Sequence, residues 1–227
     1  MIVAVAGGKG GVGKSTTAWN LGRELDAVVV DGDLAVPDLP SGPDAGPDLH
    51  DVLAGRADPL EAVADAGPVS VLPSGRTLSG ARASSLEALP SVLDRLERRW
   101  DHVVVDCPAG LARDVGVELG CADLAVLVTT PSRAALVDAI RTSDLVASLE
   151  TPLGAAVLNK ADRDTHSDLA DRLGRRLGVD VTLVAEQAAV ADAQARWQPV
   201  RDHRPDAQAV DAYRAVADRL ERASEPS

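Results

Sequence analysis

Residues 7–16 constrain the fold of this 227-residue chain more than any other segment. They read Gly-Gly-Lys-Gly-Gly-Val-Gly-Lys-Ser-Thr, directly after a short apolar run and directly before an amphipathic stretch. Glycines let the backbone curl so that its N–H groups point inward at phosphate oxygens, and the N-terminus of a following helix adds partial positive charge. The segment therefore predicts a strand, a phosphate-binding loop and a helix in succession.

The loop meets the pattern G-x-x-x-x-G-K-[ST], in which each residue type has a task. We expect Lys14 to reach the β- and γ-phosphates of a nucleotide, Ser15 to ligate Mg²⁺, and Thr16 to bond the α-phosphate. The alternative is a glycine-rich turn with a chance Lys-Ser pair, and the predicted strand and helix argue against it. The other predicted nucleotide-binding positions of the loop are Gly8, Lys9, Gly10, Gly11, Val12 and Gly13.

Lysine is rare in this chain, which makes its positions informative. Of the 23 basic residues only Lys9, Lys14 and Lys160 are lysine, and all three fall within nucleotide-binding patterns. Asparagine likewise occurs only at Asn20, on the predicted helix after the loop, and at Asn159. Arginine supplies positive charge elsewhere, so the three lysines indicate specific contacts.

The run Lys-Gly-Gly-Val-Gly-Lys-Ser from Lys9 to Ser15 resembles the deviant Walker A signature of the MinD/ParA ATPases. The resemblance extends over nearly the whole chain. It implies that Lys9 reaches across a nucleotide-sandwich homodimer to the partner's phosphates, where a cation supplied in trans stabilises charge on the transferred phosphoryl group. Hydrolysis of ATP with Mg²⁺ would then depend on dimerisation.

Two further apolar runs end in aspartate. The first leads into Asp31-Gly32-Asp33, whose two carboxylates face the same way at alternate positions, and the second leads into Asp106-Cys107-Pro108-Ala109-Gly110. The resemblance implies that Asp31 and Asp106 contact the Mg²⁺ shell and that Asp33 positions the attacking water. It also implies that Gly110 offers its backbone N–H to the γ-phosphate. Asp38 departs from the asparagine usual in Min-type proteins.

Asn159-Lys160-Ala161-Asp162 follows another apolar run and leaves the base open to two interpretations. Resembling ATPases place an asparagine here whose amide reads the adenine edge, so Asn159 and Lys160 are predicted nucleotide contacts. N-K-x-D is also the guanine motif of GTPases, although Asp162 can instead open the polar run before a helix. The deviant loop favours adenine, and hence ATP.

Strand-length apolar runs alternate with helix-length amphipathic stretches along the chain, which predicts one α/β domain over residues 1–227. We expect a mostly parallel twisted sheet with helices on both faces, a surface loop at 37–47, and a frayed tail at 223–227. The predicted strands are 2–6, 27–30, 69–72, 102–105, 124–128, 155–158 and 181–184. The predicted helices are 15–25, 85–98, 134–149, 167–177 and 207–222.

Composition narrows the partners and the compartment. A net charge of −12 argues against nucleic acid or anionic membranes as binding partners. Adaptation of the surface to high salt would weaken that argument, because salt screens charge. A GC-rich genome would also explain the composition. No apolar run is long enough to span a membrane, so we expect a cytoplasmic protein.

Cys107 and Cys121 form no C-x-x-C pair and are expected to be buried and inert. The four histidines lack metal-ligand spacing and are expected at the surface or at strand edges.

The favoured function is a Min-like ATPase that dimerises on ATP, binds an unidentified protein partner on the dimer surface, and resets by slow hydrolysis. Such a switch would act in division-site placement, polar organisation or segregation. The alternatives are a ParA-type DNA partition ATPase and a biosynthetic ligase of the dethiobiotin or cobyrinic-acid synthase type.

Trp197 lies where relatives usually place glycine, and ordinary packing is the favoured explanation. We expect no direct membrane insertion, because the apolar stripe of the last predicted helix suits packing on the domain: Val210, Tyr213, Val216, Ala217 and Leu220.

Overall fold

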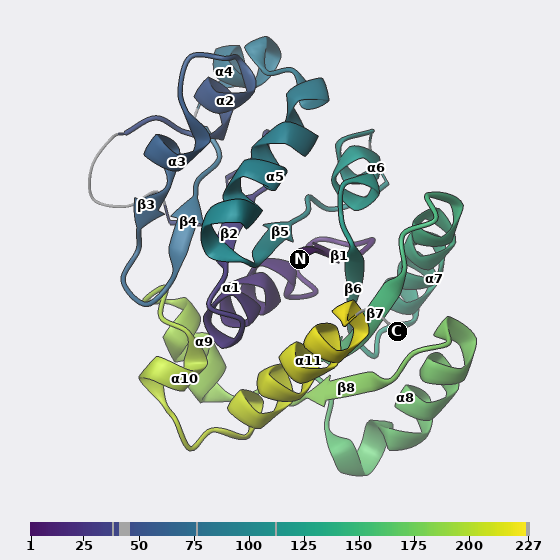
Figure 1. Cartoon of the computed structure of the whole chain (residues 1–227). Helices are drawn as coiled ribbons and strands as arrows, with labels where there is room; N and C mark the ends of the chain where they lie inside the picture. Colours follow the sequence, from purple (N-terminus) through teal and green to yellow (C-terminus); the bar gives the residue numbers. More distant parts are fainter. Residues whose placement is uncertain (38, 41–45, 76, 112, 226–227) are drawn as a thin grey trace.

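A single sheet with helices on both sides organises the molecule (Figure 1). The computed structural model describes residues 1–37, 39, 40, 46–75, 77–111 and 113–225. Within these residues the strand order is β3-β4-β2-β5-β1-β6-β7-β8, and only β3 and β4 pair antiparallel. The strands are β1 (Ile2–Ala6), β2 (Val28–Asp31), β3 (Ala64–Asp65), β4 (Ser70–Leu72), β5 (Val103–Asp106), β6 (Leu124–Thr129), β7 (Leu153–Asn159) and β8 (Val181–Val184).

Alternate residues of the central strand β1 are buried in two different hydrophobic cores, one on each face of the sheet. Val3 and Val5 of β1 pack on the side of α1 and α11, whereas Ile2, Ala4 and Ala6 pack on the side of α5 and α6. A strand buried on both faces needs a continuous apolar run, which is the pattern read from the sequence. The helices are α1 (Lys14–Glu24), α2 (Leu49–Leu53), α3 (Pro59–Ala62), α4 (Leu78–Ala83), α5 (Leu89–Trp100), α6 (Arg113–Gly120), α7 (Arg133–Ser148), α8 (Arg163–Leu177), α9 (Ala188–Gln194), α10 (Val200–His203) and α11 (Gln208–Ser224).

The direction in which successive strands are added to the sheet reverses at β1. This reversal determines where a ligand crevice forms. After β1 the chain builds β2 and β5 on one side of it, and then β6, β7 and β8 on the other. Ligands of open parallel sheets bind outside the carboxyl ends of the strands at such a reversal. The loop between β1 and α1 lies at this point, so the topology and the phosphate-binding pattern indicate the same place.

The predicted fold class is confirmed, and the differences are local. Each predicted strand is present to within two residues, whereas the two-residue β3 and the short helices α2, α3, α4, α6, α9 and α10 were not predicted. Helix α5 begins at Leu89, later than predicted, because Pro90 stands in its first turn and a separate 3₁₀ turn precedes it. Asp38 and most of the predicted loop lie outside the described residues, and the described residues between 37 and 47 form neither helix nor strand.

The last helix uses its apolar stripe inside the molecule. The stripe on α11 is at most 3% exposed and packs against α1, β7 and β8, as predicted. Among the described residues no helix is both long and apolar enough to cross a membrane. The helix runs to Ser224, two residues further than predicted.

Candidate nucleotide-binding site

Two glycines of the phosphate-binding loop adopt backbone conformations that other residues rarely reach. Gly11 has a φ of 77° and Gly13 a φ of 100°, both in the left-handed region that glycine enters without steric cost. Gly13 stands directly before α1, and a Cβ at this position would lie 2.1 Å from Nδ2 of Asn159. The loop therefore needs glycine both for its conformation and for the close approach of the end of β7.

The two lysines of the loop lie in different environments. Lys14 is the first residue of α1, is 8% exposed and lines the cavity at the loop, whereas Lys9 is exposed to solvent. Ser15 and Thr16 follow on the first turn of α1 and line the same cavity. This turn carries no acidic side chain, so the positive end of the helix dipole is not offset there. The start of α1 is suited to holding an anion.

The end of β7 supports the loop from outside. Nδ2 of Asn159 donates to the carbonyl oxygen of Val12 at 2.8 Å, and its Oδ1 accepts from the N–H of Lys160 at 2.9 Å. Nζ of Lys160 lies 3.5 Å from the carbonyl oxygen of Gly11. Asn159 and Lys160 both line the cavity, and each atom of the Asn159 amide keeps one further hydrogen-bonding position for a base.

Two buried aspartates stand side by side behind the phosphate loop. Asp31 and Asp106 are paired in register on β2 and β5, at 0% and 3% exposure. Asp31 accepts from the N–H groups of Asp33 and Leu39, at 3.2 and 3.1 Å. Asp106 lines the cavity together with the Ser15 hydroxyl. A hydroxyl and buried carboxylates at one sheet edge are the oxygen ligands that a hydrated Mg²⁺ prefers, so these residues fit the metal that the sequence implies.

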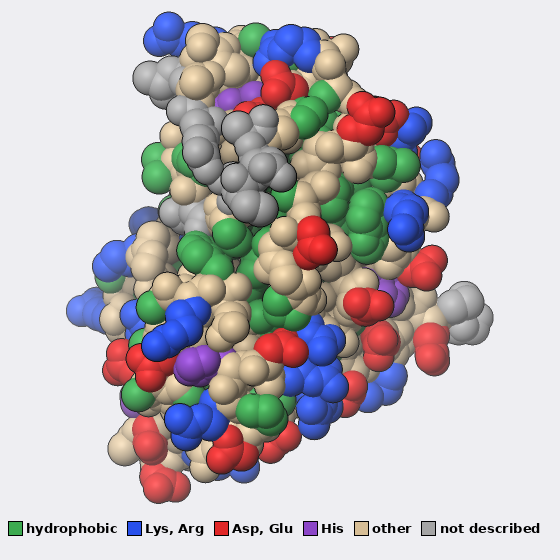
Figure 2. Space-filling view, turned by 90° about the vertical axis from the view of Figure 1, so that its left-hand side faces the viewer, with side chains coloured by type: hydrophobic (Ala, Val, Ile, Leu, Met, Phe, Trp, Pro, Cys, Tyr) green, Lys and Arg blue, Asp and Glu red, His purple; other side chains and the backbone are tan. Residues whose placement is uncertain are grey.

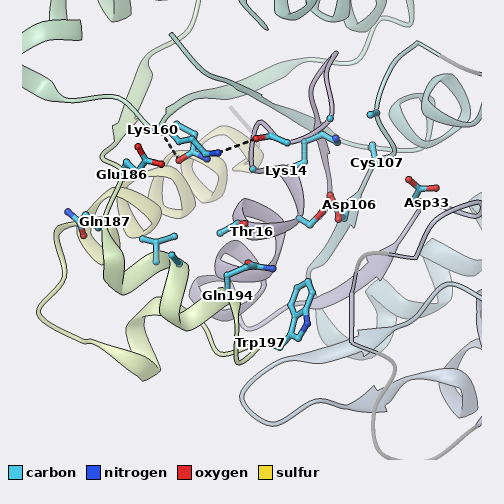
Figure 3. Close-up of a pocket in the computed structure, with 18 of the residues that line it drawn as sticks. Lys14, Thr16, Asp33, Asp106, Cys107, Lys160, Glu186, Gln187, Gln194 and Trp197 are labelled. Carbon is cyan, nitrogen blue, oxygen red and sulfur yellow. Dashed lines mark hydrogen bonds between the residues drawn. The ribbon is translucent and has the colours of Figure 1, made fainter. Parts of the chain in front are cut away.

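Two predicted site residues lie on the turns after β2 and β5, and of the two only Asp33 lines the cavity. Asp33 is half-buried, lines the cavity, and holds its own turn by accepting from the N–H groups of Ala35 and Val36 at 3.1 and 2.9 Å. Gly110 has a φ of 96° on the turn after β5, where glycine is again the residue with least strain. Figure 3 shows Asp33 to the right of Lys14 and Asp106, on the Asp106 side of the cavity.

A cavity of about 520 Å³ lies between the start of α1, Asp33, Asp106 and the end of β7, and the sequence did not predict one of its walls. That wall comes from the segment after β8 and from α9. Val190, Ala191 and Gln194 lie on one face of α9, three or four residues apart, a spacing that marks a helix face but does not show what the face lines. The residues of the whole wall are Ala185, Glu186, Gln187, Val190, Ala191, Gln194 and Trp197. The cavity has the size and the mixed lining of a small-molecule site.

A carboxyl and a thiol lie buried behind Asp106. Glu118 on α6 is 1% exposed, and its Oε1 lies 2.6 Å from the position that a Cβ at Gly32 would take. Burial raises the pKa of Glu118 well above its usual value, and the neighbouring carboxylates Asp114, Asp106 and Asp33 raise it further, against a lowering hydrogen bond from Cys107. Burial likewise raises the pKa of the Cys107 thiol. Both environments favour the neutral form, which limits negative charge beside the two aspartates.

Two expectations about side-chain environment need correction. The prediction that all four histidines lie at the surface or at strand edges is wrong for His50, which is 2% exposed on α2. Its Nε2 lies 3.0 Å from the carbonyl oxygen of Leu34, next to Asp33. Cys107 is buried as predicted, whereas Cys121 is only half-buried. Burial raises the pKa of the Cys121 thiol too, which keeps it a weak nucleophile.

Asp162 serves helix α8 rather than the cavity. It is the N-cap residue of α8, and its carboxylate accepts from the N–H groups of Asp164 and Thr165 at 2.8 and 3.3 Å. It does not line the nucleotide cavity. The carboxylate that a guanine site would need is therefore engaged in capping, and α8 starts four residues earlier than predicted for the same reason.

Comparison with known proteins agrees with this geometry. Residues 3–200 match the family model described as the CobQ/CobB/MinD/ParA nucleotide binding domain. The chain belongs to the MinD/ParA family. It is 33% identical to an uncharacterised ATP-binding protein of Methanocaldococcus jannaschii over 96% of this chain and 86% of that protein. It is 29% identical to the septum site-determining protein MinD of Bacillus subtilis, over 96% of this chain and 88% of that protein.

Solved structures of MinD/ParA proteins have the same fold. The cell division ATPase MinD of Pyrococcus furiosus superposes with a TM-score of 0.87 at 27% identity, covering 98% of this chain and 99% of that one. The predicted resemblance to the MinD/ParA family is thus confirmed. Membership of a nucleotide-binding family, with an ATP-binding protein among the relatives, supports ATP binding by this chain.

Proposed function

We propose that this MinD/ParA family member is an ATP-dependent dimerisation switch that hydrolyses Mg-ATP slowly and acts in cellular positioning in the cytoplasm. The observation that carries the proposal is the contrast between the two lysines of one loop. Lys14 lines the cavity of its own chain, while Lys9 is exposed at the rim, where it can reach the phosphates bound by a second copy. A loop that served only its own nucleotide would have no use for a second, exposed lysine.

Within one chain the site has a role for each group. Lys14 and the N–H groups at the start of α1 balance phosphate charge, and Thr16 bonds the α-phosphate. Ser15, Asp31 and Asp106 would hold Mg²⁺, which when bound neutralises charge on the phosphate oxygens. Asp33, at the rim beside this cluster, orients the attacking water. Gly110 offers its N–H to the terminal phosphate.

Exposed apolar residues beside the cavity support a face-to-face dimer. Val36 is 62% exposed next to the Asp33 turn, and Leu111 is 50% exposed directly after Gly110. These are two of the three large apolar side chains that are exposed in the described part of the chain. Both would be covered if a second copy closed over the nucleotide. We propose that the unidentified protein partner binds the surface formed by this dimer.

The proposal competes with the two other functions that the sequence allows. Basic and acidic side chains are interspersed on the face shown in Figure 2, which does not suggest a basic DNA-binding strip there. A cobyrinic acid a,c-diamide synthase of Mycobacterium smegmatis shares the fold at a TM-score of 0.68 and 23% identity, which shows the fold alone. We also propose no membrane insertion through α11, because its apolar stripe is already buried.

Light scattering of the protein with ADP and with ATP tests the switch. We expect a monomer with ADP and a dimer with ATP, and an ATPase rate per molecule that rises with protein concentration. Lys14→Ala should abolish nucleotide binding, whereas Lys9→Ala should bind ATP and remain monomeric and inactive. Arg98→Ala, which removes an exposed charge on α5, is the matched control. Equal loss of nucleotide affinity in both lysine variants would refute a trans role for Lys9.

A further inference from the structure

Trp197 occupies a backbone position that favours glycine. Its N–H bonds the carbonyl oxygen of Gln194 at 3.1 Å, and the N–H of Gln198 bonds that of Ala193 at 3.0 Å, which together form the Schellman motif that ends α9. Trp197 has a φ of 49°, in the left-handed region where a bulky side chain is strained. Such strain persists only where the surroundings hold it, and it often marks a functional position.

The turn carrying Trp197 is fastened to α1, the helix that begins at the phosphate loop. The Trp197 ring meets the ring of Trp19 edge-on, with centroids 5.7 Å apart and planes at 76°. The N–H of Val200 donates to Oδ1 of Asn20 at 2.8 Å, and Nδ2 of Asn20 donates to the carbonyl oxygen of Thr16 at 2.7 Å. The indole is therefore held at a fixed distance from the first turn of α1.

One part of the Trp197 ring packs on the core and another part faces the cavity. Val190, Gln194 and Trp197 follow one another at a helical spacing of three and four residues and share a wall of the cavity. Figure 3 shows this wall on the same side of the cavity as Thr16. The phosphate loop and this wall line the same cavity, so a nucleotide whose phosphates occupy the loop can place its nucleoside against the wall.

We propose that Trp197 is a nucleoside-positioning residue whose partly exposed ring packs against the sugar and base of the bound nucleotide. The inference rests on nucleotide binding and does not require the dimer or hydrolysis. An indole supplies a large, rigid apolar surface at small entropic cost, which a glycine in this turn would not provide. The Trp197 ring packs against the core and, in this proposal, against the nucleotide. These two contacts together offset the strain in its backbone.

Quenching of tryptophan fluorescence by acrylamide tests the contact directly. The chain has three tryptophans, of which Trp19 is fully buried and Trp100, the last residue of α5, is half-buried against the core on the other side of the sheet. In a Trp100→Phe protein the accessible emission comes from Trp197. We expect ADP to lower the quenching constant roughly twofold, since the nucleoside covers one face of the ring. Tripolyphosphate, which lacks the nucleoside, should leave the constant unchanged, and unchanged quenching with saturating ADP would overturn the proposal.

Calorimetric affinities of Trp197→Gly and Trp197→Phe separate a ligand contact from simple packing. Glycine suits the left-handed turn, so the variant should fold, and we expect it to bind ADP and ATP roughly tenfold more weakly. Trp197→Phe should recover most of that affinity, and displacement by tripolyphosphate should not change. Unaltered ADP affinity in the glycine variant, or an equal loss for tripolyphosphate, would show a structural role only. If ADP binds normally and ATP yields no dimer, the switch fails while this inference stands; a wild-type protein that binds no nucleotide would refute both.

Discussion

The side-chain amide of Asn159 donates to the carbonyl oxygen of Val12 across 2.8 Å, so the last residue of β7 braces the phosphate loop. Val12 is 3% exposed, and its carbonyl oxygen would lose a partner in a buried setting if this bond were removed. A loop that binds phosphate through backbone N–H groups has to keep its shape before the ligand arrives. Asn159 contributes to that shape from 147 residues away in sequence.

The substitution Asn159→Asp tests whether the hydrogen bond from Asn159 to Val12 holds the phosphate loop in shape. The variant keeps the size and the Oδ1 acceptor of the side chain but cannot donate to Val12, and it places a carboxylate beside the carbonyl oxygen. We expect the free energy of unfolding to fall by about 1–3 kcal/mol and nucleotide affinity to fall with it. Urea unfolding and calorimetry measure the two quantities. Gln187→Ala, in the wall after β8, should affect affinity alone. Unchanged stability of Asn159→Asp would show that this hydrogen bond does not hold the loop.

His50 is predicted to position the segment that carries Asp33. Its Nε2 bonds the carbonyl oxygen of Leu34, and its ring packs so closely that a Cβ at Gly75 would lie 2.0 Å from Nδ1. His50→Leu removes the donor, whereas His50→Gln places an amide N–H in a similar position. We expect the leucine variant to lose roughly tenfold in kcat with ATP affinity unchanged, and the glutamine variant to retain most of the activity. Equal kcat values for the two variants would contradict this role.

Sequence patterns predicted the parts of this protein that depend on local chemistry. The strands, the phosphate loop and the buried aspartates follow from apolar runs and from glycine, lysine and aspartate at fixed spacing. Three features could not be predicted in this way. The burial of His50 and Glu118 depends on which helices pack together. The wall formed by α9 and its flanking residues depends on where a segment far from the loop in sequence folds back. Those are properties of tertiary packing, which no local pattern encodes.

The stability of the metal-free protein should decline with rising pH because of Glu118. Its pKa is raised by burial above the usual value of 4.5, so the folded state binds its proton more tightly than the unfolded state. The stabilisation is complete below that usual value and is lost as pH rises through the raised pKa, by at most about 1.4 kcal/mol per pH unit. Glu118→Gln cannot ionise and should flatten this decline.

Urea unfolding of wild type and Glu118→Gln across this pH range gives the comparison. Cys107 also has a raised pKa, but its titration matters only above its usual value of 9.0, so the difference at lower pH belongs to Glu118. Cys107→Ala should therefore leave the pH dependence near neutrality in place. Parallel curves for wild type and Glu118→Gln would mean that the carboxyl titrates as in the unfolded chain.

Asp162 should matter for stability and not for the choice of base. As the N-cap of α8 its carboxylate accepts two backbone N–H groups, and it lies outside the lining of the nucleotide cavity. Asp162→Ala should lower the free energy of unfolding by about 0.5–2 kcal/mol, while Asp162→Ser, which can still cap, should lower it less. Competition of ATP and GTP against a fluorescent ATP analogue should favour ATP by the same ratio in all three proteins. If GTP displaces the analogue better than ATP, and that preference disappears in Asp162→Ala, the N-K-x-D segment reads guanine and the assignment to ATP is wrong.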